Sequence, residues 1–183
     1  MTRRPLTVRP ARAADGPALA ALYASFVRDS IVSFETEPPD GDEMVRRLEA
    51  HRAHPWLVAT DDRDQPAGYA YGTPHRARAG YRWSVETTVY VAEPGRGTGR
   101  LLMERLLSEC ADRGLVSAFA GVALPNDASE ALHRGLEFSR IGVFPRVGWK
   151  LGRWVDVSWW YRPLLDPPPD QPPPLPPGGS PAP

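Results

Sequence analysis

The chain has 183 residues, of which 42% are hydrophobic and 24% are charged, as expected for one globular domain with a sizeable core. Its 22 basic and 22 acidic residues cancel, so no overall positive field points to nucleic acid or to an acidic membrane. The single cysteine, Cys110, excludes an intramolecular disulfide and fits the reducing cytosol. The N-terminus lacks the apolar run of a signal peptide, and no apolar run is long enough to span a bilayer, so we expect a cytoplasmic protein.

Hydrophobic periodicity and turn residues predict a mixed α/β order within residues 1–165. In chain order the elements are a strand at 6–9, helices from Asp15 and from Asp42, strands at 56–60, 67–72 and 84–91, a helix ending at Arg113, a strand at 117–124, a helix ending at His133, and strands at 140–147 and 155–161. Residues 166–183 contain ten prolines in 18 positions, so we expect a disordered or polyproline II tail. Docking of residues 172–177 on an aromatic groove is a less favoured alternative.

The segment that follows the predicted strand at 84–91 is the most informative part of the sequence. It reads Pro94-Gly-Arg-Gly-Thr-Gly99 and leads into an amphipathic helix. A glycine-rich turn before a helix N-terminus presents backbone N–H groups that suit a diphosphate. Arg96 and Arg100 would add flanking positive charge. A flexible turn without a ligand is the alternative interpretation.

Two other glycine loops do not fit this spacing. A Walker A loop ends in Gly-Lys-Ser/Thr, whereas Gly99 is followed by Arg100 and Leu101. A Rossmann turn needs Gly-x-Gly-x-x-Gly and an acidic residue about 20 positions later. Here the glycines are at 95, 97 and 99, and residues 117–124 contain no carboxylate. We therefore predict a short loop that holds a pyrophosphate against the main chain.

Glu86 is a carboxylate in the middle of the predicted strand at 84–91. Alternation places it on the same face as Tyr90, close to the glycine loop. It could simply lie on a wetted sheet face. Alternatively, it accepts a proton from an ammonium group that must become a neutral amine before it attacks a thioester. The second interpretation connects Glu86 with the glycine loop through an acyl-CoA donor.

The loop at residues 74–83 holds three arginines and two aromatic residues beside that strand. It is either a solvated charged loop or a pocket mouth whose guanidinium groups bind a carboxylate or phosphinate. Nucleic-acid binding through Arg76, Arg78 and Arg82 is disfavoured, because no basic stripe extends beyond the loop. His133 lies on a short helix farther along, where a lone histidine is more often structural than catalytic.

Several segments together resemble the phosphinothricin N-acetyltransferases, within the GNAT acetyltransferases. They are residues 32–38, 55–59, 68–71, 76–78, 81–83, 86–91, 124–127, 132–133, 148–154 and 156–157. The resemblance covers nearly all of residues 6–162. It implies the GNAT fold, with a mixed and mostly antiparallel central sheet flanked by helices. It also implies acetyl transfer from acetyl-CoA to the α-amino group of a small acidic amino-acid analogue such as phosphinothricin, with herbicide resistance as the associated property, a homodimer and no metal.

The resemblance also assigns roles to individual residues. It implies Glu86 as the general base and His133 as a second catalytic residue. The acceptor pocket would be lined by Phe34, Arg76, Arg78, Tyr81 and Tyr90. The segment of Val89, Tyr90 and Val91 would splay from its neighbouring strand and bind the pantetheine, and Asn126 would contact the CoA arm. The pyrophosphate would bind Arg96, Gly97, Thr98, Gly99, Arg100 and Leu101.

The sequence departs from the family pattern in two places. The glycine loop is shorter than usual, with Pro94 where the motif normally opens with Gln or Arg. Leu136-Glu137-Phe138 lacks the usual glycine before the aromatic residue, so we expect Gly135 to end the helix earlier and to shift His133. Two rival functions stay open: a GNAT enzyme for another amine, such as methionine sulfone or methionine sulfoximine, and a CoA-binding sensor without turnover. Glu86 argues against the sensor, because a pure binder needs no proton acceptor there.

Overall fold

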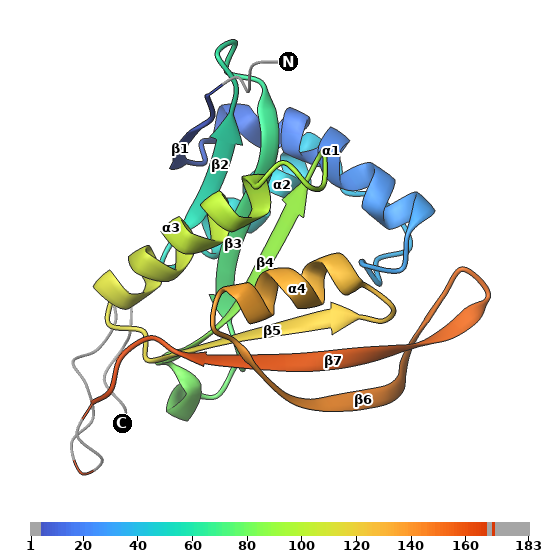
Figure 1. Cartoon of the computed structure of the whole chain (residues 1–183). Helices are drawn as coiled ribbons and strands as arrows, with labels where there is room; N and C mark the ends of the chain where they lie inside the picture. Colours follow the sequence, from blue (N-terminus) through green and yellow to red (C-terminus); the bar gives the residue numbers. More distant parts are fainter. Residues whose placement is uncertain (1–4, 168–169, 171–183) are drawn as a thin grey trace.

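The computed structural model describes residues 5–167 and 170, which form a seven-stranded sheet with helices on both faces (Figure 1). In chain order the elements are β1 (Thr7–Pro10), η1 (Ala13–Asp15), α1 (Gly16–Asp29), α2 (Gly41–Ala50), β2 (Trp56–Thr60), β3 (Pro66–Pro74), η2 (Ala79–Tyr81), β4 (Ser84–Val91), α3 (Thr98–Asp112), β5 (Ser117–Ala123), α4 (Asp127–Gly135), β6 (Ser139–Lys150) and β7 (Arg153–Pro163). The predicted proline tail lies almost entirely outside the described residues. Among the described helices, none combines the length and the apolar character that crossing a bilayer requires.

The sheet confirms the predicted fold class. Its strand order is β1-β2-β3-β4-β5-β7-β6, and all neighbouring pairs are antiparallel except β4 and β5. The hairpin predicted at residues 56–60 and 67–72 forms β2 and β3. The last two strands form one long hairpin, which extends beyond the predicted ranges 140–147 and 155–161 at both ends.

Alternation along the strands separates two apolar layers. In β2, Leu57 and Ala59 pack with the buried residues of α3, whereas Trp56 and Val58 pack with those of α1 and α2. Helix α4 covers β5 and β7 on the same side as α3, and α1 and α2 lie behind the sheet (Figure 1). Each face of the central strands is therefore covered by a different pair of helices.

The helix starts follow local capping chemistry. Helix α2 begins at Gly41 rather than at Asp42, because the side chain of Asp40 accepts the Glu43 amide at 2.8 Å. Helix α4 begins after Asn126, whose side-chain oxygen accepts the Ser129 amide at 3.1 Å. Short polar side chains thus decide both boundaries.

Helix α4 ends at Gly135, as expected, and keeps a regular C-terminal turn. Glu137 takes the left-handed conformation, with φ 63°, that glycine adopts more easily. The Phe138 amide donates to the His133 carbonyl at 3.0 Å, and the Glu137 amide donates to the Arg134 carbonyl at 3.1 Å. The turn therefore forms without the glycine that the resemblance led us to expect, and His133 lies in the last turn of the helix.

Strands β4 and β5 part soon after they meet. Ser84, Val85 and Glu86 pair with residues 117–119, and the pairing ends there. The Thr87 hydroxyl donates to the Phe119 carbonyl at 3.1 Å where the strands separate. Beyond this point β4 continues along β3 while β5 runs along β7, so the two strands form a V (Figure 1). Within the described residues, the backbone of 88–91 has no strand partner on this side, as expected for the splay predicted at residues 89–91.

Candidate active site

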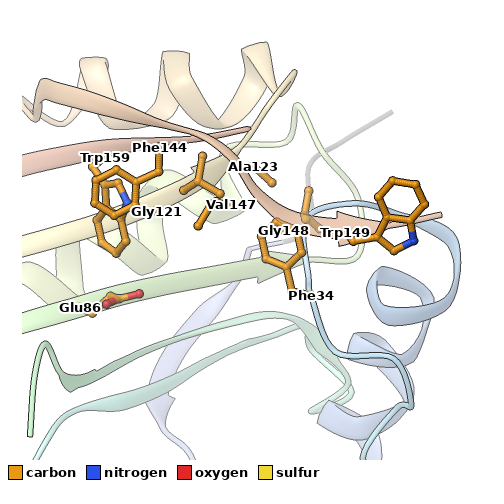
Figure 2. A pocket seen from close by; sticks show the side chains of 11 residues that line it. Phe34, Glu86, Gly121, Ala123, Phe144, Val147, Gly148, Trp149 and Trp159 are labelled. Atoms are coloured by element: carbon orange, nitrogen blue, oxygen red, sulfur yellow. The ribbon is translucent and has the colours of Figure 1, made fainter. Parts of the chain in front are cut away.

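A cavity of about 490 Å³ lies between β4, β5, the β6–β7 hairpin and the loop that follows α1 (Figure 2). It is lined by Val32, Phe34, Glu86, Gly121, Ala123, Phe144, Val147, Gly148, Trp149, Val157 and Trp159. Glu86 is the one ionisable group in this lining, and the other walls are apolar or aromatic. The volume suits a small molecule such as an amino acid.

Phe34 closes one end of the cavity against the β6–β7 hairpin (Figure 2). Its ring occupies the space that a side chain at Gly148 would take, because a Cβ there would lie 2.1 Å from Phe34 Cε1. The neighbouring Glu35 is tied down twice: its carboxylate pairs with Arg47 at 2.7 Å, and its carbonyl accepts a hydrogen bond from Lys150. The loop that carries Phe34 is therefore fixed to both α2 and the hairpin.

Glu86 points into the cavity from β4, and about a third of its side chain (33%) is exposed (Figure 2). Burial raises the pKa of its carboxyl group, and the positive charge of Arg76 opposes this rise. Arg76 Nη1 lies 4.0 Å from Glu86 Oε2, and His75 Nδ1 lies 3.6 Å from the same oxygen. A carboxylate with raised proton affinity beside a cavity of this size is suited to take a proton from an ammonium group.

The loop at residues 74–83 folds back over β5 and β7 beside Glu86. Arg76 places its guanidinium 5.8 Å from the ring centre of Trp159. Tyr81 meets the His75 ring edge-on, with ring centres 6.3 Å apart. Arg78 is exposed at the start of η2 and lies outside the cavity lining. Of the three acceptor-binding residues predicted in this loop, Arg76 is the one whose charge is paired with Glu86.

Tyr90, predicted for both the acceptor and the cofactor, lies on the α1 side of β4. Its ring centre is 4.8 Å from that of Tyr23 and 5.0 Å from that of Phe26. Burial raises the pKa of its phenol well above the ordinary value. The side chain therefore belongs to an aromatic cluster outside the cavity lining, and the backbone is the part of Tyr90 that faces the gap.

The predicted diphosphate loop owes its shape to two glycines. Gly95 and Gly97 have φ values of 79° and 80°, and a Cβ at either position would meet nothing within 4 Å. Glycine is thus needed for the backbone conformation rather than for space. Helix α3 starts directly after Gly97, so the amides of Thr98, Gly99 and Arg100 have no carbonyl one turn earlier to bond. They form a place for an anion at the helix N-terminus.

The two arginines of the loop are already engaged. Arg96 Nε pairs with Glu93 at 2.5 Å, and Arg100 Nε pairs with Glu104 at 2.8 Å. Both arginines are exposed, as is the next residue, Leu101. A bound pyrophosphate would have to compete with two carboxylates for these side chains. The helix amides are therefore the stronger part of the site.

His133 belongs to α4, and Asn126 is the residue that caps its N-terminus. The Asn126 oxygen caps the helix, so its side-chain nitrogen is the atom left for a CoA contact. His133 is buried, and its Nδ1 lies 2.8 Å from the Ser129 carbonyl, which fixes the proton on Nδ1. Burial lowers the pKa of His133, and the bond to Ser129 opposes this. The imidazole is thus held neutral, with Nε2 unprotonated.

The sheet separates His133 from Glu86. The His133 ring lies 6.1 Å from that of Trp160, which belongs to the core packed beneath α3 and α4. Trp159, the preceding residue of β7, points to the other face and lines the cavity with Glu86. The two residues predicted to be catalytic are therefore not brought together on one face, and the catalytic role of His133 stays a prediction.

A model of the acetyltransferase (GNAT) family matches residues 19–138. The chain belongs to the GNAT acetyltransferase family. A phosphinothricin N-acetyltransferase of Streptomyces coelicolor is 42% identical over 163 residues, which are 86% of this chain and 95% of the relative. An L-methionine sulfoximine/L-methionine sulfone acetyltransferase of Pseudomonas aeruginosa is 33% identical over 156 residues, covering 83% of this chain and 91% of that protein.

A solved structure gives the same assignment. The crystal structure of a GNAT superfamily phosphinothricin acetyltransferase from Sinorhizobium meliloti in complex with AcCoA matches with a TM-score of 0.84 and 33% identity, covering 86% of this chain and 88% of that one. This GNAT chain is thus an acetyltransferase of the phosphinothricin N-acetyltransferase type. Among its described residues, no group of three or more acidic, histidine or cysteine side chains is arranged to hold a metal ion.

Sequence reasoning missed much of the cavity wall of this GNAT domain. Gly121 of β5, Trp159 of β7, and Phe144 and Trp149 of β6 were not predicted as site residues, and neither was His75 beside Glu86. Alternation along the predicted strand at residues 155–161 could have placed Trp159 on the face opposite Trp160. No local signal indicates that this face meets the loop that carries Phe34.

Proposed function

We propose that this chain transfers the acetyl group of acetyl-CoA to the α-amino group of phosphinothricin or a similar small amino-acid analogue. The observation that carries the proposal is the Glu86 carboxylate, which lies in the wall of a cavity of amino-acid size where β4 leaves β5. The choice of phosphinothricin as the acceptor is supported by the name of the Streptomyces relative. The proposal places the enzyme in the cytoplasm, where acetyl-CoA is available and the buried thiol of Cys110 stays reduced.

Two backbone features would hold the coenzyme. The unpaired edge of β4 at residues 88–91 would bind the amides of the pantetheine arm, as an added strand does. The first amides of α3, at Thr98, Gly99 and Arg100, would bind the pyrophosphate. Bound acetyl-CoA supplies an activated thioester carbonyl. With the pyrophosphate at the helix and the arm along β4, the coenzyme would run toward Glu86.

Glu86 would start the reaction by accepting one proton from the ammonium group of the acceptor. The amine lone pair that this frees forms the new C–N bond at the thioester carbonyl. The C–S bond then breaks, which leaves the N-acetyl product and a thiolate that takes up a proton. A backbone N–H near Tyr90 or Val91 would stabilise the negative charge that develops on the carbonyl oxygen.

His133 would support this chemistry from the far face of the sheet. Its ring packs against Phe138 at 5.2 Å and holds α4 over the core. Leu132, the residue before His133 in α4, packs against the start of α3, where we place the coenzyme. A Cβ at Gly99 of α3 would lie 3.4 Å from the Leu132 side chain. We therefore assign His133 to the positioning of α4 against the start of α3.

The cavity lining favours a second class of acceptor. Apart from Glu86 the walls are apolar or aromatic, and neither Arg76 nor Arg78, the arginines predicted to line the acceptor pocket, is among them. An uncharged side chain such as that of methionine sulfone or methionine sulfoximine fits such walls without desolvating a charge. The name of the Pseudomonas relative supports this class.

We also propose that the enzyme is a homodimer formed through β6. This strand is the last of the sheet, and the hairpin exposes the large apolar side chains of Ile141, Phe144, Val147, Trp149, Leu151 and Trp154. A patch of this kind is typical of an interface. Phe144 and Trp149 also line the cavity, so a partner seated here would close it. Light scattering should give twice the mass of the chain, and a charged substitution at Trp154 should give the monomer.

Acetyl-CoA consumption with a panel of amino acids and their phosphinate, sulfone and sulfoximine analogues tests the function. We expect Glu86→Gln to lower kcat at least about a hundredfold and to leave acetyl-CoA binding intact by calorimetry. The matched control is Glu49→Gln, which removes an exposed carboxylate of α2. If the wild type acetylates none of the panel, the CoA-binding sensor replaces the enzyme. Equal rates for the Glu86 variant and the wild type would remove Glu86 from the mechanism.

A further inference from the structure

His75, at the start of the 74–83 loop, has a buried polar atom that the chemistry above does not use. Its Nδ1 is inaccessible to solvent and has no hydrogen-bond partner within the described part of the chain. Buried polar nitrogens are almost always paired, so this one requires an explanation. Glu86 Oε2 lies 3.6 Å away.

The His75 ring is held in place from several sides. It stacks on Phe119 of β5, with ring centres 4.3 Å apart and an angle of 16° between the planes. Tyr81 and Trp159 meet it edge-on at 6.3 and 6.0 Å. The His75 amide donates to the Ser84 carbonyl at 3.3 Å, which anchors the backbone to the start of β4. Packing therefore fixes which ring atom faces Glu86, and only 12% of the side chain is exposed.

We propose that His75 is a positioning residue for Glu86, whose Nδ1–H donates to Oε2 and leaves the second carboxylate oxygen free for the ammonium proton of the acceptor. The inference rests on the proposed function, since it requires Glu86 to be the general base. A separation of 3.6 Å is longer than a formed hydrogen bond, and contacts of catalytic groups commonly shorten once substrate is bound. His75 transfers no proton in this scheme; it orients the group that does.

The surroundings favour the tautomer with the proton on Nδ1. Burial lowers the pKa of His75, and the charge of Arg76 adds to this, so the ring is neutral at pH 7 with one protonated nitrogen. An unprotonated Nδ1 would turn its lone pair toward a carboxylate oxygen, whereas Nδ1–H offers that oxygen a donor. Among the described residues, four other side chains lie against His75 or Glu86. Arg76 and Tyr81 belong to the loop, and Phe119 of β5 and Trp159 of β7 are uncharged.

Three substitutions separate the Nδ1 donor from the bulk of the ring. His75→Asn places an amide N–H near the position of Nδ1, and His75→Gln places one near Nε2, with similar polarity. His75→Phe keeps the stack on Phe119 and removes both nitrogens. For each variant, kcat and kcat/KM are measured from pH 5 to pH 9, together with acetyl-CoA binding and the melting temperature.

We expect kcat of the Phe and Gln variants to fall about ten- to 150-fold, as for the loss of a hydrogen bond to a charged group. Loss of the donor raises the pKa of Glu86, so the acid limb of kcat/KM should move to higher pH in these two variants. The Asn variant should recover most of the rate and the wild-type limb. Acetyl-CoA binding should not change in any of them, because the coenzyme groups lie elsewhere.

The outcomes distinguish this inference from the proposed function. An active wild type and an inactive Glu86→Gln variant, with wild-type pH profiles in the Phe and Gln variants, overturn the role of His75 alone. Equal losses in the Asn and Gln variants also overturn it, because the effect would then follow the ring and not the donor. If the Phe variant fails to fold, the Asn and Gln pair decides the question. A wild type without acetyl transfer fails the proposed function itself.

Discussion

The substitution Gly148→Ala tests whether the contact between the β6–β7 hairpin and Phe34 shapes the acceptor pocket. The added Cβ would lie 2.1, 2.5 and 2.6 Å from three atoms of the Phe34 ring. Ordinary carbon contacts begin near about 3.5 Å, so the ring must withdraw by about 1.4 Å or rotate away. Its backbone cannot follow easily, because the carbonyl of the next residue, Glu35, is bonded to Lys150. We therefore expect the ring to turn into solvent.

The size of the effect follows from how Phe34 is placed. The residue is already 40% exposed, so losing the rest of its contacts should lower the free energy of unfolding by about 1 to 2 kcal/mol. The acceptor loses one aromatic wall, which is worth about 1 kcal/mol, or about a fivefold rise in the KM of the acceptor. The KM of acetyl-CoA should not change, because the proposed coenzyme groups lie on β4 and α3.

The assay is acetyl-CoA consumption with either substrate varied, alongside thermal melting. Gly142→Ala in the same strand is the matched control, since a Cβ at Gly142 meets nothing within 4 Å. In a Phe34→Ala background, Gly148→Ala should add no further loss, because the clashing ring is gone. An unchanged acceptor KM in the single variant, or losses that simply add in the double variant, would refute the reasoning.

Three further predictions concern Glu86 and the end of α4. Burial raises the pKa of Glu86 in the folded state, so kcat/KM should fall as the pH drops through that raised value, which lies above the 4.5 of a free side chain. A raised folded pKa also means that the carboxyl costs stability once the pH rises through the unfolded value, so Glu86→Gln should melt higher than the wild type at pH 7 and equally below about pH 4. Glu137→Gly should stabilise the protein by about 0.5 kcal/mol in chemical denaturation, because relief of the left-handed strain, about 1 kcal/mol, outweighs the exposed pair with Arg162. A destabilised Glu137 variant would contradict this, as would an acid limb for Glu86 at or below the ordinary carboxylate value.

Interactions between residues close in sequence were sufficient to predict the helices and strands, and to predict which face of β4 carries Glu86. Alternation placed Glu86 and Tyr90 on one face of β4, and the structure has them there. The glycine-rich turn predicted before a helix is present, and α3 begins directly after Gly97. Helix boundaries were predicted less accurately: with Asp40 as its cap, α2 starts at Gly41, one residue before the predicted Asp42. In each case the deciding interaction joins residues close in sequence.

Long-range packing decided the rest of the site. The place where β4 leaves β5, the meeting of Phe34 with Gly148, and the approach of His75 to Glu86 over Phe119 each depend on contacts between segments that are not neighbours in the sequence. The sequence by itself determined the family resemblance through its motifs, and the strand faces and the glycine turn before α3 through the periodicity of apolar residues and the spacing of the glycines. Only the tertiary structure decided that His133 packs on the side of the sheet covered by α3 and α4 and His75 on the opposite side, because the face on which a helix or loop packs is set by the whole core and not by its own residues.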